Sequence, residues 1–191
     1  MRNCALRKSA LARLAVSTGL ALWGVAAQAA LKPGDLAPDF TLPAAVGGKD
    51  FTFALADAQK KGPVVVYFYP KSFTRGCTLE AHEFADHAAD FEAAGASIIG
   101  VSSDTIETQR DFSTKECRDK FPVAADARLS AITAYDAKRE QPSASGETLA
   151  NRVSYVVAGG KIVFALTSLN PIEHVQSTLA FVRKWRDEHQ H

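Results

Sequence analysis

Beyond residue 30, the chain shows two kinds of hydrophobic pattern: short unbroken apolar runs and longer amphipathic stretches. Residues 64–69 (VVVYFY) and 97–101 (SIIGV) are apolar runs rich in β-branched and aromatic residues, which is typical of strands buried on both faces. Within residues 77–94, Phe84 and Phe91 belong to a set of apolar positions at three- and four-residue spacing. That spacing predicts a helix with one apolar face.

The rest of this region continues the alternation of strand and helix patterns. Strands are expected within residues 31–50 and at residues 51–55, 122–126, 152–157 and 161–166, and helices at residues 104–117, 129–135 and from Asn170 onwards. Asp104 is the expected N-cap of its helix, with Glu107 three residues later. Residues 136–151 are polar and predict a loop, whereas Ala158-Gly159-Gly160 is a hairpin signal. Because parallel crossovers and a terminal hairpin occur together, we predict one α/β domain with a central mixed β-sheet flanked by helices.

The first 29 residues follow a different pattern, which is that of a targeting segment. Four basic residues and no acidic residue precede an apolar run at residues 14–27, and the AQA at residues 27–29 fits a small-x-small cleavage site. The apolar run is shorter than the ~20 residues that span a bilayer, which argues against a permanent anchor. We therefore expect a cleaved secretory signal peptide at residues 1–29, a folded domain at residues 30–191, a periplasmic location and no stable membrane association after cleavage.

Composition and charge narrow the function classes. With 47% hydrophobic and 23% charged residues, the chain has enough apolar material for a core, which excludes global disorder. The net charge of the whole chain is +1. Removal of the four basic residues of the signal segment leaves 18 basic against 21 acidic residues, a net charge of −3. Neither value suggests nucleic acid as a partner.

The three cysteines are too few for a disulfide scaffold, and one of them, Cys4, would leave with the signal peptide. Cys77 and Cys117 would then be the two cysteines of the mature chain, in an oxidising compartment. The five-residue steps from Cys77 to His82 and from His82 to His87 suit a metal site on a helix poorly, and no Gly-rich phosphate loop occurs. We expect no metal and no bound cofactor.

The setting of Cys77 is the most informative chemistry in the sequence. The predicted strand at residues 64–69 ends at Pro70, and a short loop leads to Cys77 in the first turn of a helix, where free N–H groups and the helix dipole favour a thiolate. Thr74 places a hydroxyl on the same loop, while Pro70 stiffens the loop and has no N–H. Cys77 therefore fits either a poised nucleophile or a buried, inert cysteine. Glu80 could orient this site or simply complement the helix dipole.

The pattern Pro70-x-x-x-Thr74-x-x-Cys77 resembles the signature of the peroxiredoxins. The surrounding residues 68–84 (FYPKSFTRGCTLEAHEF) resemble the bacterioferritin-comigratory-protein (PrxQ-like) branch of the AhpC/TSA family. Residues 34–40 (GDLAPDF) and 152–157 (RVSYVV) extend the resemblance over most of the chain. It implies a thioredoxin-like fold and a cofactor-free, thiol-dependent peroxidase of antioxidant defence. Such an enzyme reduces hydrogen peroxide or organic hydroperoxides and is recycled by a thioredoxin-like reductant.

The resemblance also implies a role for individual residues. Cys77 would be the peroxidatic cysteine, which attacks the O–O bond and becomes a sulfenic acid. Thr74 would hydrogen-bond the peroxide, and Pro70 would cover the sulfenate. Arg152 would hold the thiolate and stabilise the charge that develops as the bond breaks, a task that suits a permanently charged side chain. Without the resemblance, Arg152 would be taken for a surface charge at the start of a strand.

One departure from the family concerns the resolving cysteine. Many relatives carry it five residues after the peroxidatic cysteine, where this chain has His82. We expect Cys117 to take this role and to form an intramolecular disulfide with Cys77. Resolution by an external thiol is the first alternative. The second is a non-catalytic, thioredoxin-fold binding domain in which a Cys77–Cys117 disulfide is structural. We expect the protein to be a monomer or a weak homodimer.

Overall fold

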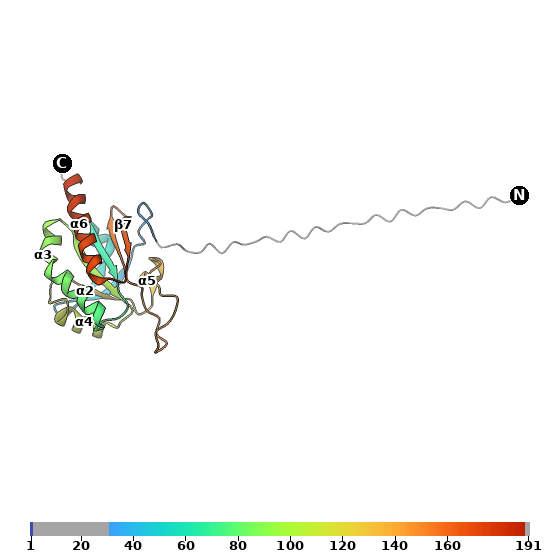
Figure 1. Cartoon of the computed structure of the whole chain (residues 1–191), viewed down its shortest axis with the longest axis horizontal. Coiled ribbons are helices and arrows are strands. Elements are labelled where there is room, and N and C mark those ends of the chain that lie inside the picture. Colours follow the sequence, from blue (N-terminus) through green and yellow to red (C-terminus); the bar gives the residue numbers. More distant parts are fainter. Residues whose placement is uncertain (2–30, 190–191) are drawn as a thin grey trace.

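The computed structural model describes Met1 and residues 31–189, and a seven-stranded sheet in the order β2-β1-β5-β4-β3-β6-β7 runs through this region (Figure 1). The strands are β1 (Thr41–Val46), β2 (Lys49–Ala54), β3 (Val64–Phe68), β4 (Ser97–Ser102), β5 (Val123–Ala125), β6 (Val153–Ala158) and β7 (Lys161–Thr167). The β3–β4 and β4–β5 pairs are parallel, and the other four pairs are antiparallel. The predicted mixed sheet is thus confirmed.

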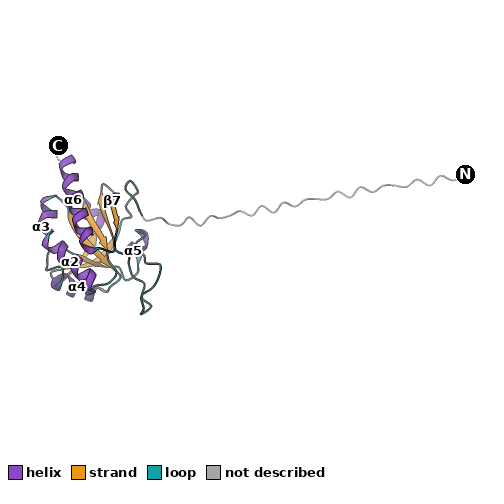
Figure 2. Cartoon of the chain, in the orientation of Figure 1, coloured by secondary structure: helices purple, strands orange, loops and turns teal. Residues whose placement is uncertain are grey.

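Helices cover both faces of the sheet, as the alternation of patterns predicted (Figure 2). They are α1 (Leu55–Gln59), α2 (Arg75–Asp86), α3 (Ala88–Ala93), α4 (Ile106–Lys115), α5 (Ser130–Ala134) and α6 (Pro171–His189). Figure 1 shows α2, α3, α4 and α6 together on one side of the sheet and α5 on the other. None of the helices in the described residues is long and apolar enough to cross a membrane.

The central strand β3 explains why the VVVYFY run has no polar position. Val64, Val66 and Phe68 point into one hydrophobic cluster, which includes residues of α1 and α5. Val65 and Tyr67 point into a second cluster, which includes residues of α2, α3, α4 and α6. Successive side chains of a strand face opposite sides, so a strand covered on both faces is apolar at every position.

Three local predictions differ from the structure. The expected helix at 77–94 is two helices, because His87 leaves the helical region at φ −103° and ψ 8°. The N-cap of α4 is Thr105, whose side chain accepts a hydrogen bond from the Thr108 backbone N–H, whereas the Asp104 carboxylate accepts one from the Ser72 backbone N–H. The short helix α1 was not predicted, since five residues are too few for a helical period to show.

Other predictions are confirmed. Gly159 and Gly160 form the turn between β6 and β7 with φ values of 56° and 74°, which glycine adopts without steric cost. Asn170 Oδ1 accepts a hydrogen bond from the Ile172 N–H, and Pro171 is the first residue of α6. The expected signal peptide lies outside the described residues.

Candidate active site

The register of the sheet brings two distant segments of the chain together. Strand β3 pairs with β6 in antiparallel register, so that its last residue, Phe68, lies opposite the first residue of β6, Val153. The loop that follows β3 and the residue that precedes β6 are therefore neighbours. That residue is Arg152, and the loop carries the chain to Cys77 at the start of α2.

Cys77 is the third residue of α2 and is 2% exposed. Arg152 Nη2 donates a hydrogen bond to Cys77 Sγ at 3.4 Å. Thr74, the N-cap residue of α2, has extended backbone angles, and its carbonyl oxygen accepts from the Thr78 N–H at 2.8 Å. The sulfur thus lies in the first turn of a helix, against a guanidinium, with positive charge supplied from two directions.

Arg152 also contacts the carboxyl group of Glu80, one helical turn after Cys77. The Glu80 side chain is fully buried and the Arg152 side chain is 9% exposed. Burial raises the pKa of Glu80 to about 8, although the charge of Arg152 acts in the opposite direction. Arg152 Nη1 donates to Glu80 Oε2, while Oε1 has no hydrogen-bond partner among the described residues. Of the two interpretations of Glu80, the contact favours orientation of the site.

The loop before α2 holds Thr74 in a defined position. Thr74 Oγ1 donates to the carbonyl oxygen of Lys71 at 2.9 Å, which leaves the lone pairs of the hydroxyl free to accept. Phe73 has a φ of 62°, in the left-handed region that a bulky residue rarely adopts. Pro70, half-buried, begins the loop directly after the fully buried Tyr69.

A buried polar network fixes this loop to the rest of the domain, and sequence patterns did not reveal it. The Gln109 side chain of α4 is fully buried. Its Oε1 accepts from the Tyr69 hydroxyl at 2.7 Å, and its Nε2 donates to Ser102 Oγ at 2.6 Å. Ser72 takes part through Asp104, whose carboxylate accepts from both the Ser72 N–H and Ser102 Oγ at 2.8 Å. A polar position on an amphipathic helix gives no signal that it faces inward.

Cys117 follows the end of α4 and is also fully buried. Burial raises the pKa of its thiol well above the ordinary value, and the nearby carboxylates of Glu116 and Asp119 act in the same direction. Both Cys77 and Cys117 are free thiols in this structure. Of the predicted site residues, Pro70, Thr74, Cys77 and Arg152 therefore gather at one end of β3 and β6, whereas Cys117 is not bonded to Cys77.

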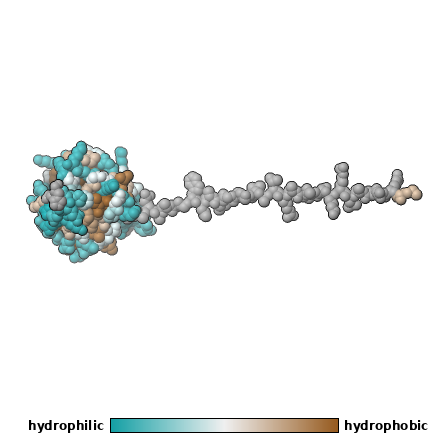
Figure 3. Space-filling model, turned by 90° about the horizontal axis from the view of Figure 1, so that it is seen from above, coloured by the Kyte–Doolittle hydropathy of each residue, from teal (hydrophilic) through white to brown (hydrophobic). Residues whose placement is uncertain are grey.

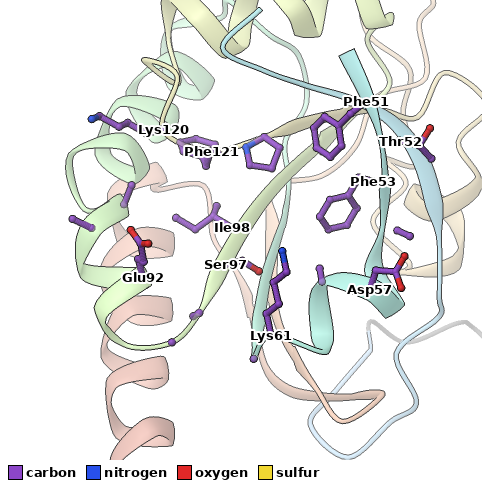
Figure 4. Close-up of a pocket in the computed structure, with 18 residues that line it drawn as sticks. Phe51, Thr52, Phe53, Asp57, Lys61, Glu92, Ser97, Ile98, Lys120 and Phe121 are labelled. Carbon is purple, nitrogen blue, oxygen red and sulfur yellow. The ribbon is translucent and has the colours of Figure 1, made fainter. Parts of the chain in front are cut away.

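Among the hollows on the described part of the domain are two of different size. The larger, of about 810 Å³, is lined by β2, α1, α3 and the start of β4, and contains no predicted site residue (Figure 4). In Figure 4, Phe51 and Phe53 form one side of it, and Lys61 extends into it. The smaller, of about 320 Å³, includes Lys71, Ser72 and Phe73 and so adjoins the loop that leads to Cys77. No group of three or more potential metal ligands occurs within the described residues.

Apolar side chains at the surface also mark this end of the molecule. Figure 3 shows a surface where hydrophilic residues predominate and hydrophobic ones gather in small patches. Phe73 and Leu79, which flank Cys77 in the sequence, are 44% and 40% exposed. Exposed apolar side chains close in sequence to Cys77 suit contact with an organic molecule or a protein.

The scaffold is a mixed sheet covered by helices, and at its site an arginine lies against the sulfur of a cysteine at a helix start. These features define a thiol-based redox site on a thioredoxin-like scaffold. The AhpC/TSA family model matches residues 33–165, and the chain belongs to this family. It is a peroxiredoxin, a thiol-dependent peroxidase.

Individual relatives support the PrxQ-like branch. The chain is 38% identical over 148 residues to a protein of Mycobacterium tuberculosis (strain H37Rv) described as a peroxiredoxin, a match that covers 76% of this chain and 90% of the relative. Peroxiredoxin Bcp of Escherichia coli K12 is 32% identical over 162 residues, covering 83% and 97%.

Two solved structures agree with this assignment. Peroxidoxin BcpB of Mycobacterium tuberculosis superposes with a TM-score of 0.72 at 30% identity, covering 81% of this chain and 97% of that one. Peroxiredoxin Q of Xanthomonas campestris does so with a TM-score of 0.67 at 27% identity, covering 76% and 91%.

Proposed function

We propose that Cys77 is the peroxidatic cysteine of this enzyme. Its thiolate attacks one oxygen of the peroxide, the S–O bond forms as the O–O bond breaks, and the second oxygen leaves as an alkoxide or hydroxide that takes up a proton. The sulfur is oxidised to a sulfenic acid and the peroxide is reduced to an alcohol or water.

The observation that carries this proposal is the 3.4 Å contact between Arg152 Nη2 and Cys77 Sγ. Both the thiolate and the departing oxygen are anionic, so a fixed guanidinium stabilises charge before and during the reaction. Thr74 lies on the same loop with its hydroxyl proton already donated to Lys71, and its lone pairs can accept the O–H of a bound hydroperoxide. Pro70 shields the loop and adds no competing donor.

The proposed substrates are hydrogen peroxide and organic hydroperoxides. The exposed side chains of Phe73 and Leu79 would accommodate an alkyl group near the sulfur. The bacterioferritin comigratory protein of Xanthomonas campestris, 28% identical with a TM-score of 0.66, has a solved structure concerned with its alkyl peroxide reduction activity. That precedent supports organic hydroperoxides as substrates here.

We further propose that Cys117 resolves the sulfenic acid by forming a disulfide with Cys77, with release of water. A thioredoxin-like dithiol then reduces the disulfide and becomes oxidised itself. Since the N-terminal pattern predicts export, this reductant would have to be present in the periplasm. Both cysteines belong to the same hydrophobic cluster, which supports an intramolecular reaction.

One experiment tests both assignments. Reduced protein is mixed with one equivalent of peroxide, and peroxide loss and intact mass are followed for the wild type, Cys77→Ser and Cys117→Ser. We expect rapid consumption that disappears in Cys77→Ser, and a loss of about 2 Da that requires Cys117. Consumption at the wild-type rate by Cys77→Ser would refute the peroxidatic assignment and favour the binding-domain alternative. A sulfenate that persists in the wild type would point to an external resolving thiol.

Export has its own test. The protein is isolated from a periplasmic fraction, and its N-terminus is determined. We expect it to begin within a residue or two of Ala30. A full-length protein retained in the cytoplasm would refute export without affecting the assignment of Cys77.

A further inference from the structure

Helix α6 buries a histidine for which the proposed chemistry has no use. The buried positions of this helix are His174, Val175, Thr178, Leu179 and Val182. His174 lies fully buried in this otherwise largely apolar set. A polar atom in the interior costs free energy unless it has a hydrogen-bond partner, and an imidazole ring has two such atoms. The partners of the two ring nitrogens therefore show what His174 holds in place.

The two nitrogens of His174 contact two different strand ends. Nδ1 lies 2.8 Å from Ser154 Oγ of β6, and Nε2 lies 3.0 Å from the carbonyl oxygen of Ser168, the residue after β7. A carbonyl oxygen can only accept, so Nε2 carries a proton and donates it. Burial lowers the pKa of His174 below its ordinary value and outweighs the hydrogen bond to Ser168. The ring is therefore neutral at pH 7, and Nδ1 accepts from the Ser154 hydroxyl.

The two contacts of the ring lie on either side of Arg152. Ser154 is two residues after Arg152 in the chain. Val153, the first residue of β6, pairs with Thr167, the last residue of β7. Arg152 and Ser168 are thus the next residues at the same end of this antiparallel pair. One imidazole ring therefore joins the strand that follows Arg152 to the end of the neighbouring strand.

Arg152 and the ring also lie in the same layer of the molecule. The Arg152 side chain contacts Glu80 of α2, and the Ser154 side chain contacts His174 of α6. Helices α2 and α6 lie together on one side of the sheet (Figure 1). In keeping with this, the positive charge of Arg152 also lowers the pKa of His174.

The position of Arg152 depends on restraints of this kind. Its Nη2 reaches Cys77 Sγ at 3.4 Å, from a residue one place outside the paired register of β6. A misplacement of about 1 Å can cost roughly 10²-fold in the rate of an enzymatic reaction. The guanidinium therefore faces the sulfur reliably only if the backbone at the start of β6 is fixed. The hydrogen bonds of His174 to Ser154 and Ser168 fix it from the side of α6.

We propose that His174 is a positioning residue for Arg152 in the reaction of Cys77 with peroxide. The proposal rests on the assignment of Cys77 as the peroxidatic cysteine. His174 takes no part in making or breaking bonds. Its neutral ring holds the start of β6 through Ser154, so that the guanidinium faces the sulfur and the departing oxygen.

Three replacements separate the two hydrogen bonds from the ring itself. His174→Leu removes both bonds and keeps an apolar side chain in the core. His174→Gln keeps one acceptor for the Ser154 hydroxyl and one donor for the Ser168 carbonyl oxygen, and it does not titrate. Ser154→Ala removes the bond to Nδ1 from the side of β6, and it decides the question even if His174→Leu folds poorly.

Thr178→Val is the matched control for packing of α6. Thr178 is fully buried one turn after His174, and its hydroxyl donates to the carbonyl oxygens of His174 and Val175 in its own helix. The substitution therefore removes a buried hydroxyl from α6 without breaking the link between α6 and β6. It should lower the melting temperature and leave the reactions of Cys77 unchanged.

Two reactions of Cys77 distinguish positioning from stability. In the Cys117→Ser background, the rate constants for hydrogen peroxide and for iodoacetamide are measured at the same pH by stopped flow. Both reactions need the thiolate, but only peroxide places a departing oxygen against Arg152. We expect the peroxide rate constant to fall by about 10-fold in His174→Leu and about 5-fold in Ser154→Ala, and alkylation by about twofold or less. His174→Gln should remain within about twofold of the parent protein in both reactions.

A double variant tests the route through Ser154. If the shared hydrogen bond carries the effect, His174→Leu with Ser154→Ala should react with peroxide as His174→Leu does alone. Fully additive losses would refute this route. An equal fall in the peroxide and iodoacetamide rates, or a wild-type peroxide rate in a destabilised His174→Leu protein, would reduce His174 to a structural residue and refute the proposal.

Cys77→Ser, measured in parallel, keeps the underlying assignment separate. Peroxide consumption at the wild-type rate by Cys77→Ser would refute the peroxidatic role itself, and the positioning role with it. If Cys77→Ser is inactive but His174→Leu and Ser154→Ala react with peroxide at the wild-type rate, only the positioning role is refuted.

Discussion

Arg152 and Cys77 lie 75 positions apart in the chain, and the Nη2 of the first is 3.4 Å from the Sγ of the second. The same guanidinium is paired with the buried carboxyl of Glu80. One cation thus serves two groups that can each be anionic. The charge state of Glu80 therefore affects how strongly Arg152 stabilises the thiolate form of Cys77.

Replacement of Arg152 by lysine should largely abolish peroxidase activity. Lysine keeps the positive charge, but its compact ammonium cannot reach both the sulfur and Glu80 through separate donors. We expect the second-order rate constant for hydrogen peroxide to fall by about 10²–10³-fold. This is the size of the effect when an enzyme loses one fixed hydrogen-bond donor to charge that develops in the transition state. Stopped-flow peroxide consumption measures this, with a thermal melt to check folding. An Arg152→Lys variant within about threefold of the wild type would show that charge alone suffices.

Glu80 should make the stability of the protein depend on pH in a defined window. Burial raises its folded pKa from 4.5 to about 8, so the native state holds one more proton than the unfolded state between these values. The wild type should therefore lose stability as pH rises through this window, by at most about 1.4 kcal/mol per pH unit, and level off above it. Glu80→Gln has no ionisable group at this position, so its stability should lack this dependence on pH. Urea unfolding of both proteins from about pH 5 to about pH 9 measures the difference, and parallel profiles would contradict the prediction.

The sequence patterns predicted the strands better than the short or interrupted helices. The run in β3 is apolar throughout because both faces are covered, and its pattern led directly to a central strand. The break at His87 was missed because the apolar face continues across it, with Phe84 and Phe91 in one cluster and in ring contact at 5.7 Å. Periodicity reports which face is buried and is insensitive to a single residue that leaves the helical region.

The residues of the site also differ in how readily the sequence identifies them. Cys77, Pro70 and Thr74 lie on one loop, so local sequence and motif identify them together. Arg152 contacts the sulfur only through the pairing of β3 with β6, and without the family resemblance a charged residue before a strand has no distinguishing mark. Gln109 is still harder to identify from the sequence, because its inward orientation depends on partners from three other segments of the chain.

Thr74 should act through its hydroxyl and not through its shape. Thr74→Val keeps the branched side chain but loses the donor to Lys71 and the proposed acceptor for the peroxide. We expect a loss of about 10–100-fold in the rate constant for hydrogen peroxide, with Thr74→Ser retaining most of the activity. The serine variant is the control, since it differs from valine chiefly in the hydroxyl. Equal losses in the two variants would assign the effect to packing of the loop.

Gln109 should be important for stability and, through the loop, for activity. Gln109→Leu leaves the Tyr69 hydroxyl, Ser102 Oγ and the Ala124 carbonyl without this buried partner. Each buried polar group that loses its partner costs about 1–3 kcal/mol, so we expect a loss of about 3 kcal/mol in the free energy of unfolding and a melting temperature lower by about 6–12 °C.

The exposed Gln176 of α6 offers the matched control, because Gln176→Leu makes the same chemical change at the surface and should shift the free energy of unfolding by less than about 0.5 kcal/mol. Since Tyr69 and Ser72 lie on the approach to Cys77, Gln109→Leu should also slow sulfenate formation at temperatures where the variant is fully folded. A variant that is destabilised yet reacts at the wild-type rate would confine the network to a structural role. If neither property changes, the buried amide is not what holds the loop in place.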